Sequence, residues 1–237
     1  MQKSVAANAK PDSESKKMTR SENGNVLWFI LIAVALLAAL TMILSRSGST
    51  VDQSGDVEQQ RVKISQMLRY AKSLEAGVQN MRLRGVSEND ISFWHDSNGD
   101  NTEDNTDTYF NANCTTTDCH IFDAGGAGLT YSTPPTGLSA ATDWIFNGTN
   151  DVLNIGTTAP DLVLILPQIR TAMCAQINRM LSASYGGTES DVDFTAFTGT
   201  FTATESIDLA ADQEAGCIDY DNTGTTEPFF YQVLIKR

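Results

Sequence analysis

The sequence is poor in the residues and motifs on which most enzyme active sites are built. It has only two histidines, His95 and His120, and it contains no Walker phosphate loop, Gly-x-Ser-x-Gly elbow or His-Glu-x-x-His pair. Basic residues are also scarce, with 16 Lys and Arg against 29 Asp and Glu and a net charge of −13. An acidic surface repels phosphate backbones. We therefore expect no enzyme activity and no nucleic-acid partner.

Charge is absent from one long stretch, residues 26–44, which reads VLWFILIAVALLAALTMIL. As a helix with a rise of about 1.5 Å per residue, it matches the roughly 30 Å hydrocarbon core of a bilayer. We therefore expect a transmembrane helix over residues 25–45. A cleaved secretory signal is the alternative, but the run is longer than a usual signal core and lacks a clear small-x-small cleavage site.

The charges that flank this stretch predict its orientation. Five basic residues precede it, against three acidic ones, and Arg46 is the one basic residue close behind it; the five are Lys3, Lys10, Lys16, Lys17 and Arg20. By the positive-inside rule, residues 1–24 form a cytoplasmic leader and residues 46–237 lie outside.

Cysteine is rare but even in number, with four residues: Cys114, Cys119, Cys174 and Cys217. Outside the cytoplasm an even count predicts two disulfides, for which three pairings exist. We favour Cys114 with Cys119 and Cys174 with Cys217, because near neighbours in sequence are most easily held within bridging distance. Zinc bound by Cys114, Cys119 and His120 is the weaker alternative, since no fourth ligand is apparent and oxidation competes for the thiols.

Residues 46–85 are expected to form a joint followed by an amphipathic helix. The joint is placed at residues 45–55, whose glycines and serines weaken a helix. Beyond it, apolar residues recur at helical spacing up to a predicted end near residues 84–85. These stripe residues are Val57, Ile64, Met67, Ala71, Leu74, Val78 and Met81. The stripe must pack on the chain's own head or on the same helix in neighbouring copies.

Residues 86–237 predict an α+β head with a mainly antiparallel sheet and one further helix. Short apolar runs between polar clusters favour strands near residues 91–94, 120–122, 129–132, 144–146, 152–155, 162–166 and 229–235. Asn147-Gly148 is a hairpin signal, and the glycine-rich run 124–128 predicts a turn. A helix is expected from Pro167 to Leu181, ending before Gly186-Gly187.

An acidic run at residues 96–104 is the one candidate cation site. Oxygen-bearing side chains stand at every second position, which resembles the first half of a calcium loop. Its glycine is displaced, however, and the terminal bidentate Glu is missing, so a solvated loop is the competing interpretation. The candidate calcium ligands are Asp96, Asn98, Asp100 and Asp104.

The N-terminal half resembles a known family. A short basic leader ending in Gly24, an uncharged helix directly after it, an amphipathic continuation and a cysteine-bearing α+β head together resemble type IV pilins and the pseudopilins of type II secretion. The segments Gly24-Asn25-Val26-Leu27 and Cys119-His120-Ile121-Phe122 are similar to segments of pilin-like proteins of α-proteobacteria. The usual Phe at the first mature position and Glu at the fifth are here Asn25 and Phe29.

The resemblance implies a structural role. A prepilin peptidase would cut between Gly24 and Asn25, and the new N-terminus would be methylated. The apolar helices would be held in the bacterial inner membrane until an assembly machinery packs them into an extracellular filament or a periplasmic pseudopilus. The Glu that this chain lacks pairs with a neighbouring N-terminal amine in that family, which bears on self-assembly. The alternative is a permanently anchored periplasmic protein that binds a partner through its head.

Overall fold

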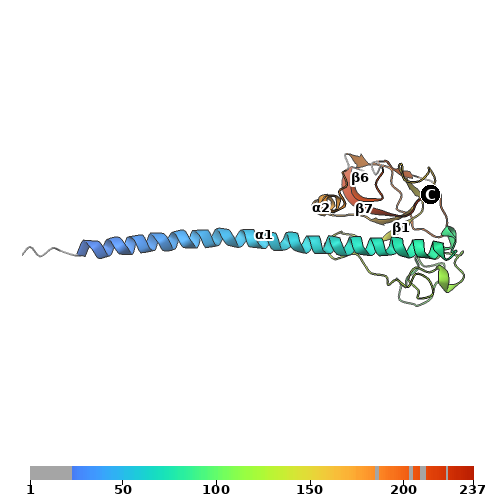
Figure 1. Ribbon diagram of the computed structural model, residues 1–237, viewed down its shortest axis with the longest axis horizontal. Coiled ribbons are helices and arrows are strands. Elements are labelled where there is room, and N and C mark those ends of the chain that lie inside the picture. Colours follow the sequence, from blue (N-terminus) through green and yellow to red (C-terminus); the bar gives the residue numbers. More distant parts are fainter. Residues whose placement is uncertain (1–22, 185–186, 203–204, 209–211, 223) are drawn as a thin grey trace, which may run out of the picture. The chain divides into compact units, whose positions relative to one another are not determined.

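The computed structural model describes residues 23–184, 187–202, 205–208, 212–222 and 224–237, without the side chains of residues 23–25, 44–55 and 222. The chain divides into two compact units, Met1–Ser54 and Gly55–Arg237. Helix α1 (Asn23–Leu83) contributes to both units (Figure 1). Its end agrees with the boundary predicted near residues 84–85. The predicted leader falls mainly on residues 1–22, outside the described residues, and the predicted joint falls on residues whose side chains are not described.

The unit Gly55–Arg237 is built around a five-stranded sheet with the order β1-β3-β7-β6-β4. Four of its strands pair antiparallel with their neighbours in this order: β1 (Ile145–Asn147), β3 (Leu162–Leu166), β7 (Thr225–Ile235) and β6 (Ala215–Asn222). The short strand β4 (Thr188–Glu189) pairs with β6 in parallel. A second, parallel pair is formed by β2 (Asn150–Val152) and β5 (Glu205–Ile207). Helix α2 (Thr171–Leu181) packs against β6 and β7 (Figure 1). The head is therefore α+β with a mostly antiparallel sheet, as the sequence predicts.

Both faces of the central strands are buried, which explains the unbroken apolar run of β3. Leu162, Leu164 and Leu166 of β3 lie in one core cluster with the buried stripe of α1. Val163 and Ile165 of the same strand lie in a second cluster on the opposite face. Side chains alternate across a strand, so a strand buried on both faces is apolar at nearly every position. The exception in the buried part of β7 is Gln232, which hydrogen-bonds to Glu75. These two clusters form the core of the head.

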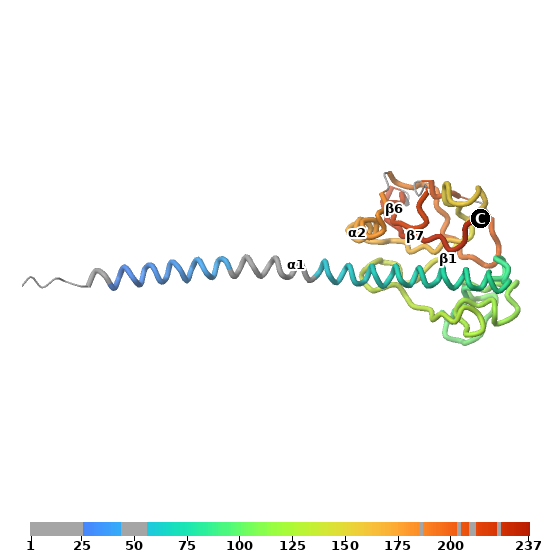
Figure 2. The backbone as a smooth tube through the Cα atoms, viewed as in Figure 1, coloured from blue at the N-terminus to red at the C-terminus, as the bar shows by residue number. Residues whose placement is uncertain are grey.

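Three expected strands, at residues 91–94, 120–122 and 129–132, are absent from the described structure. Only an isolated bridge joins Ser92 to His120. Side chains satisfy the backbone here in place of a neighbouring strand, since Asn111 Nδ2 donates to the Ile91 carbonyl at 2.9 Å. Residues 86–144 instead contain two 3-10 helices, η1 (Glu88–Asp90) and η2 (Thr117–Cys119), among loops that Figure 2 shows beside the end of α1.

Two further boundaries differ from the sequence predictions. Asn147-Gly148 is not a hairpin turn, because β1 pairs with β3 and not with β2. The Asn147 Oδ1 instead accepts the Thr149 N–H at 3.0 Å in a local turn. Helix α2 begins at Thr171 and not at Pro167, since Gln168 has a positive φ of 55° and Arg170 is extended.

Two disulfides tie the head together, in the pairing favoured from the sequence. Cys114 is bonded to Cys119 at the end of η2, across a sequence separation of 5. Cys174 of α2 is bonded to Cys217 of β6, across a separation of 43. The Cys174–Cys217 disulfide closes the longer loop of chain, because it joins α2 to a strand much later in the sequence. It therefore restricts the unfolded chain more strongly than the Cys114–Cys119 disulfide does.

A buried carboxylate anchors the end of β7. Asp161 is fully buried, and its Oδ1 and Oδ2 accept the backbone N–H groups of Arg237 at 2.9 Å and Val152 at 3.0 Å. Burial raises the pKa of Asp161 to about 6, although these two hydrogen bonds oppose the shift. Asp161, which directly precedes β3, thus joins β2 to Arg237, two residues after the end of β7, at a cost in desolvation.

The disulfides predict an order of stabilities. Replacing Cys174 and Cys217 together by Ala should lower the free energy of unfolding by about 4 kcal/mol, against about 2 kcal/mol for Cys114 and Cys119, because the longer loop restricts the unfolded chain more. Denaturant unfolding of the two double variants measures both values. Equal losses, or a larger loss for the short loop, would contradict the loop-length explanation.

Asp161 predicts a pH dependence of stability. Its pKa is higher in the folded protein, at about 6, than in an unfolded chain, at about 4. The folded state therefore binds the proton more tightly, and this contribution to stability is present below pH 4 and is lost as pH rises through about 6, by about 3 kcal/mol in all. Asp161→Asn should show a smaller loss of stability between pH 4.5 and pH 7.5 than the wild type. Asp191→Asn, which removes an exposed carboxylate, is the control and should keep the wild-type pH dependence.

Candidate functional site

The apolar part of α1 is the first candidate region. Residues Val26–Ile43 have a mean hydropathy of 2.8, and none of this span is buried within the protein. In the part of the chain that the structure describes, this is the one helix long and apolar enough to cross a membrane. Its position near the N-terminus fits a membrane anchor or a signal sequence.

The predicted cleavage site lies at the start of this helix. Gly24 and Asn25 belong to the first turn of α1 (Asn23–Leu83). Their side chains and residues 1–22 lie outside the described part of the chain. The prediction of processing at this bond therefore rests on the sequence.

The amphipathic stripe of α1 is buried in the chain's own head. Six of its seven predicted residues, from Ile64 to Met81, have an exposed fraction of 0%. Polar contacts add to the packing, since Gln79 Nε2 donates to the Leu234 carbonyl at 2.7 Å and Gln232 Nε2 to Glu75 Oε2 at 3.0 Å. Val57 is the exception, with 46% of its surface exposed. It lies two turns before Ile64, where the buried stripe begins.

The acidic run 96–104 uses its oxygens in local turns. Asp96 Oδ1 accepts the Gly99 N–H at 2.7 Å, and Asp100 Oδ1 accepts the Thr102 N–H at 2.8 Å. Asp104 Oδ1 accepts both the N–H and the hydroxyl of Thr106, and these bonds hold the pKa of Asp104 below its usual range.

These turns do not bring the candidate calcium ligands together. Asn98 donates its Nδ2 to Asp100 Oδ2 at 3.0 Å, and so points a hydrogen-bond donor at a predicted cation ligand. Among the described residues, the one group of three His, Cys, Asp or Glu ligand atoms within 4.8 Å of each other is Cys114, Cys119 and His120. Asp96, Asp100 and Asp104 are not such a group, and the solvated-loop interpretation fits better.

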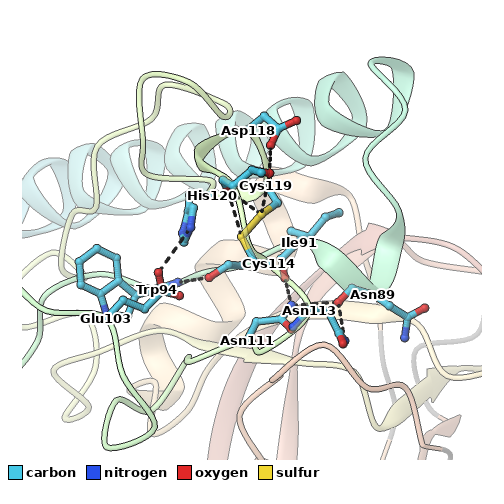
Figure 3. Close-up of a disulfide and its surroundings, with 12 residues drawn as sticks. Asn89, Ile91, Trp94, Glu103, Asn111, Asn113, Cys114, Asp118, Cys119 and His120 are labelled. Carbon is cyan, nitrogen blue, oxygen red and sulfur yellow. Dashed lines mark hydrogen bonds and ion pairs between the residues drawn. A yellow bond between two sulfur atoms is a disulfide. The ribbon is translucent and has the colours of Figure 1, made fainter.

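The group formed by Cys114, Cys119 and His120 is also not a zinc site in this state of the protein. The two sulfurs are bonded to each other, whereas zinc binds thiolates. His120 instead points away from the disulfide toward Glu103, as Figure 3 shows, with its Nε2 3.4 Å from Glu103 Oε2.

Glu103 and His120 both line a cavity of about 490 Å³. We call it the aromatic cavity. Residues from three segments of the chain line it, among them Trp94, His95, Glu103, His120, Phe122 and Tyr131. Glu103 and His120 are largely buried, with side-chain exposed fractions of 21% and 12%. Its volume is in the range of small-molecule sites.

Ring contacts fix the walls of the aromatic cavity. His95 stacks on Tyr131 with ring centroids 3.6 Å apart, and Phe122 meets both rings edge to face. The Trp94 Nε1–H donates to Asp107 Oδ2 at 2.8 Å, which holds the indole in place. Such contacts reduce the freedom of the side chains before any ligand enters.

Acidic side chains form part of the lining of the aromatic cavity. Burial raises the pKa of Glu103, and the nearby Asp107 raises it further, whereas His120 and a hydrogen bond with Ser92 lower it. Three buried side-chain atoms in this region have no hydrogen-bond partner among the described residues: Glu103 Oε1, Asp107 Oδ1 and His120 Nδ1. Unpaired buried polar atoms are uncommon and call for an explanation.

The glycine-rich run 124–128 forms the predicted turn and supports His120. The N–H groups of Gly126 and Gly128 both donate to the Asp123 carbonyl, at 3.0 and 2.8 Å. A Cβ on Gly126 would lie 1.7 Å from the His120 carbonyl oxygen, so only glycine allows this close approach. The turn therefore fixes the backbone beside the floor of the aromatic cavity.

Sequence reasoning missed the aromatic cavity, although it singled out some of its residues. It treated Asp96 as a calcium ligand and His120 as a zinc ligand, each within its own local motif. No local pattern joins Trp94, Glu103 and Tyr131, because their proximity depends on the folding of irregular loops. The one available signal was that both histidines of a histidine-poor chain stand near aromatic residues: His95 directly follows Trp94, and His120 lies two residues before Phe122.

Comparisons of the chain with protein-family models, with curated proteins and with solved structures gave no match.

Proposed function

We propose that this protein is a structural subunit of a type IV pilus-like or pseudopilus-like filament, processed after Gly24. The observation that carries the proposal is the composition of α1. One helix contains an uncharged segment without any buried residue, Val26–Ile43, and a later stripe that is buried against the mostly antiparallel sheet.

The exposed segment needs an apolar environment outside the chain. Its large side chains have exposed fractions of 39% for Ile32 up to 68% for Leu37, and such a surface is unfavourable in water. A bilayer satisfies this need before assembly, and the same segment of other subunits satisfies it in a filament. Four alanines, Ala33, Ala35, Ala38 and Ala39, allow the close approach of helices that such packing requires.

The head supports an extracytoplasmic role for the rest of the chain. Both pairs of cysteines form disulfides, and no free cysteine is present among the described residues. Structural disulfides persist in oxidising compartments and are rare in the cytoplasm. This agrees with the orientation that the basic leader predicts, in which the head lies outside.

A permanently anchored periplasmic binding protein is the second candidate. The aromatic cavity favours it, because a subunit with a purely structural role needs no such cavity. In this case the leader stays on the chain and the apolar segment remains in the membrane. The two candidates therefore differ in the N-terminal residue of the mature protein and in its location.

The deciding experiment is to determine the N-terminal residue and intact mass of the protein from membranes and from material sheared off the cell surface. A chain that begins at Asn25 with a methylated amine, and that is present in the sheared fraction, is expected for a filament subunit. A chain that begins at Met1 and stays in the membrane fraction would identify an anchored protein.

The Gly24→Leu variant tests processing directly. If a peptidase cuts after Gly24, this variant should accumulate as the full-length chain, heavier than the wild-type protein by residues 1–24, and should be missing from the sheared fraction. Gly48→Leu makes the same change behind the apolar segment and should be processed normally. Wild-type mass and distribution for Gly24→Leu would refute the filament proposal.

A further inference from the structure

We propose that the aromatic cavity binds a small organic ammonium ion with an apolar body, and that Glu103 holds its charged group. The inference concerns the head alone. It does not depend on whether the chain assembles into a filament.

The charges around the aromatic cavity select a cation. Its lining contains three carboxylates, Asp96, Glu103 and Asp123, and no Lys or Arg among the described residues. Asp107 adds a fourth negative group behind Trp94, with 8% of its surface exposed. An anionic ligand would be repelled by these groups, whereas a cation would offset the charge that the protein has buried.

The Glu103 carboxylate selects a ligand that donates hydrogen bonds. Its side chain lines the aromatic cavity and is 21% exposed, and the neighbouring His120 Nε2 lies 3.4 Å from Oε2. A primary ammonium group carries three N–H donors and a positive charge. It can pair with the carboxylate by charge and hydrogen bond together, whereas an alcohol offers one donor and no charge.

The apolar residues that line the aromatic cavity suit an apolar body. Phe122, Tyr131 and Leu129 lie around it, and aromatic faces also attract cations through their quadrupole. The stacked pair of His95 and Tyr131 is held together before binding. A rigid apolar wall next to a buried acidic floor matches a ligand with an apolar group at one end and an ammonium at the other.

Neighbouring constraints hold the floor in position. Ser92 N–H donates to the Cys119 carbonyl at 2.9 Å and Ile121 N–H to the Ser92 carbonyl at 3.0 Å, on either side of His120. The Cys114–Cys119 disulfide closes the loop directly before His120 (Figure 3). His120 is therefore fixed on a rigid support, as expected for a preformed binding site.

The test compares two probes of nearly the same shape on the full-length protein in detergent micelles. Phenethylammonium should bind the wild-type protein in calorimetric titrations, with the heat of empty micelles subtracted. Its neutral counterpart 2-phenylethanol should bind at least about tenfold more weakly, because it has no charge and only one donor. Tetramethylammonium, which has charge but no N–H, should also bind more weakly.

Two variants place the binding in the aromatic cavity. Glu103→Gln keeps the shape of the side chain but removes its charge, and should weaken phenethylammonium binding by about tenfold or more. Glu58→Gln removes the same charge from α1, where the Glu58 side chain is 70% exposed, and should bind as the wild type does. Melting curves of both variants show whether the fold is retained.

Three results would overturn the proposal: no binding of phenethylammonium to the wild-type protein, equal binding of 2-phenylethanol, or unchanged binding by a folded Glu103→Gln variant. Equal binding of the neutral probe would identify an apolar site without charge selection. If Glu103→Gln fails to fold, the comparison of the three probes on the wild-type protein still decides the question.

Discussion

The packing of the α1 stripe on one face of the sheet is the interaction on which the head depends. From Ile64 to Met81 the helix presents one fully buried stripe, and β3 and β7 provide the surface that it covers. Without the helix, that face of the two central strands would be exposed to water. The second face is covered separately by Val152 of β2, Ile207 of β5 and the loop residue Val192. The sheet is therefore the middle layer of the head, and α1 belongs to its core as much as any strand does.

The loops between α1 and β1 are ordered by side chains where regular structure would use backbone pairing. Asn111 donates to the carbonyls of both Asn89 and Ile91, and Tyr109 donates to the carbonyl of Trp144 at 2.8 Å. Buried backbone groups must find partners in some form. Asparagine and tyrosine side chains supply them here, so a region of about 60 residues without strands still forms the walls of a cavity.

Strong local patterns in the sequence predicted their elements well, and patterns that depend on distant partners did not. The uncharged segment, the stripe from Ile64 onward and the all-apolar β3 are each recognisable within one window. Strand β6 (Ala215–Asn222) was missed because its polar residues Asp219, Asp221 and Asn222 resemble a turn, and only its pairing with β7 makes it a strand. The same applies to the aromatic cavity: Trp94, Glu103 and Tyr131 are unremarkable in sequence and meet only through the loops. In the acidic run, carboxylate oxygens bond to the backbone of their own turns, which agrees with the solvated loop that was the competing interpretation.

Two glycines in the run 124–128 differ in the physical reason for which glycine is found there, and therefore in which substitutions they tolerate. Gly126 is required by space, because any side chain would collide with the His120 carbonyl. Gly128 has a positive φ of 69° with open space around it, and Asn or Asp also adopts that conformation at modest cost. During evolution, position 128 can therefore change among Gly, Asn and Asp, whereas position 126 can change only if the backbone at His120 moves as well. Among related chains, loss of glycine at position 126 would mark those whose loop around His120 has been rebuilt.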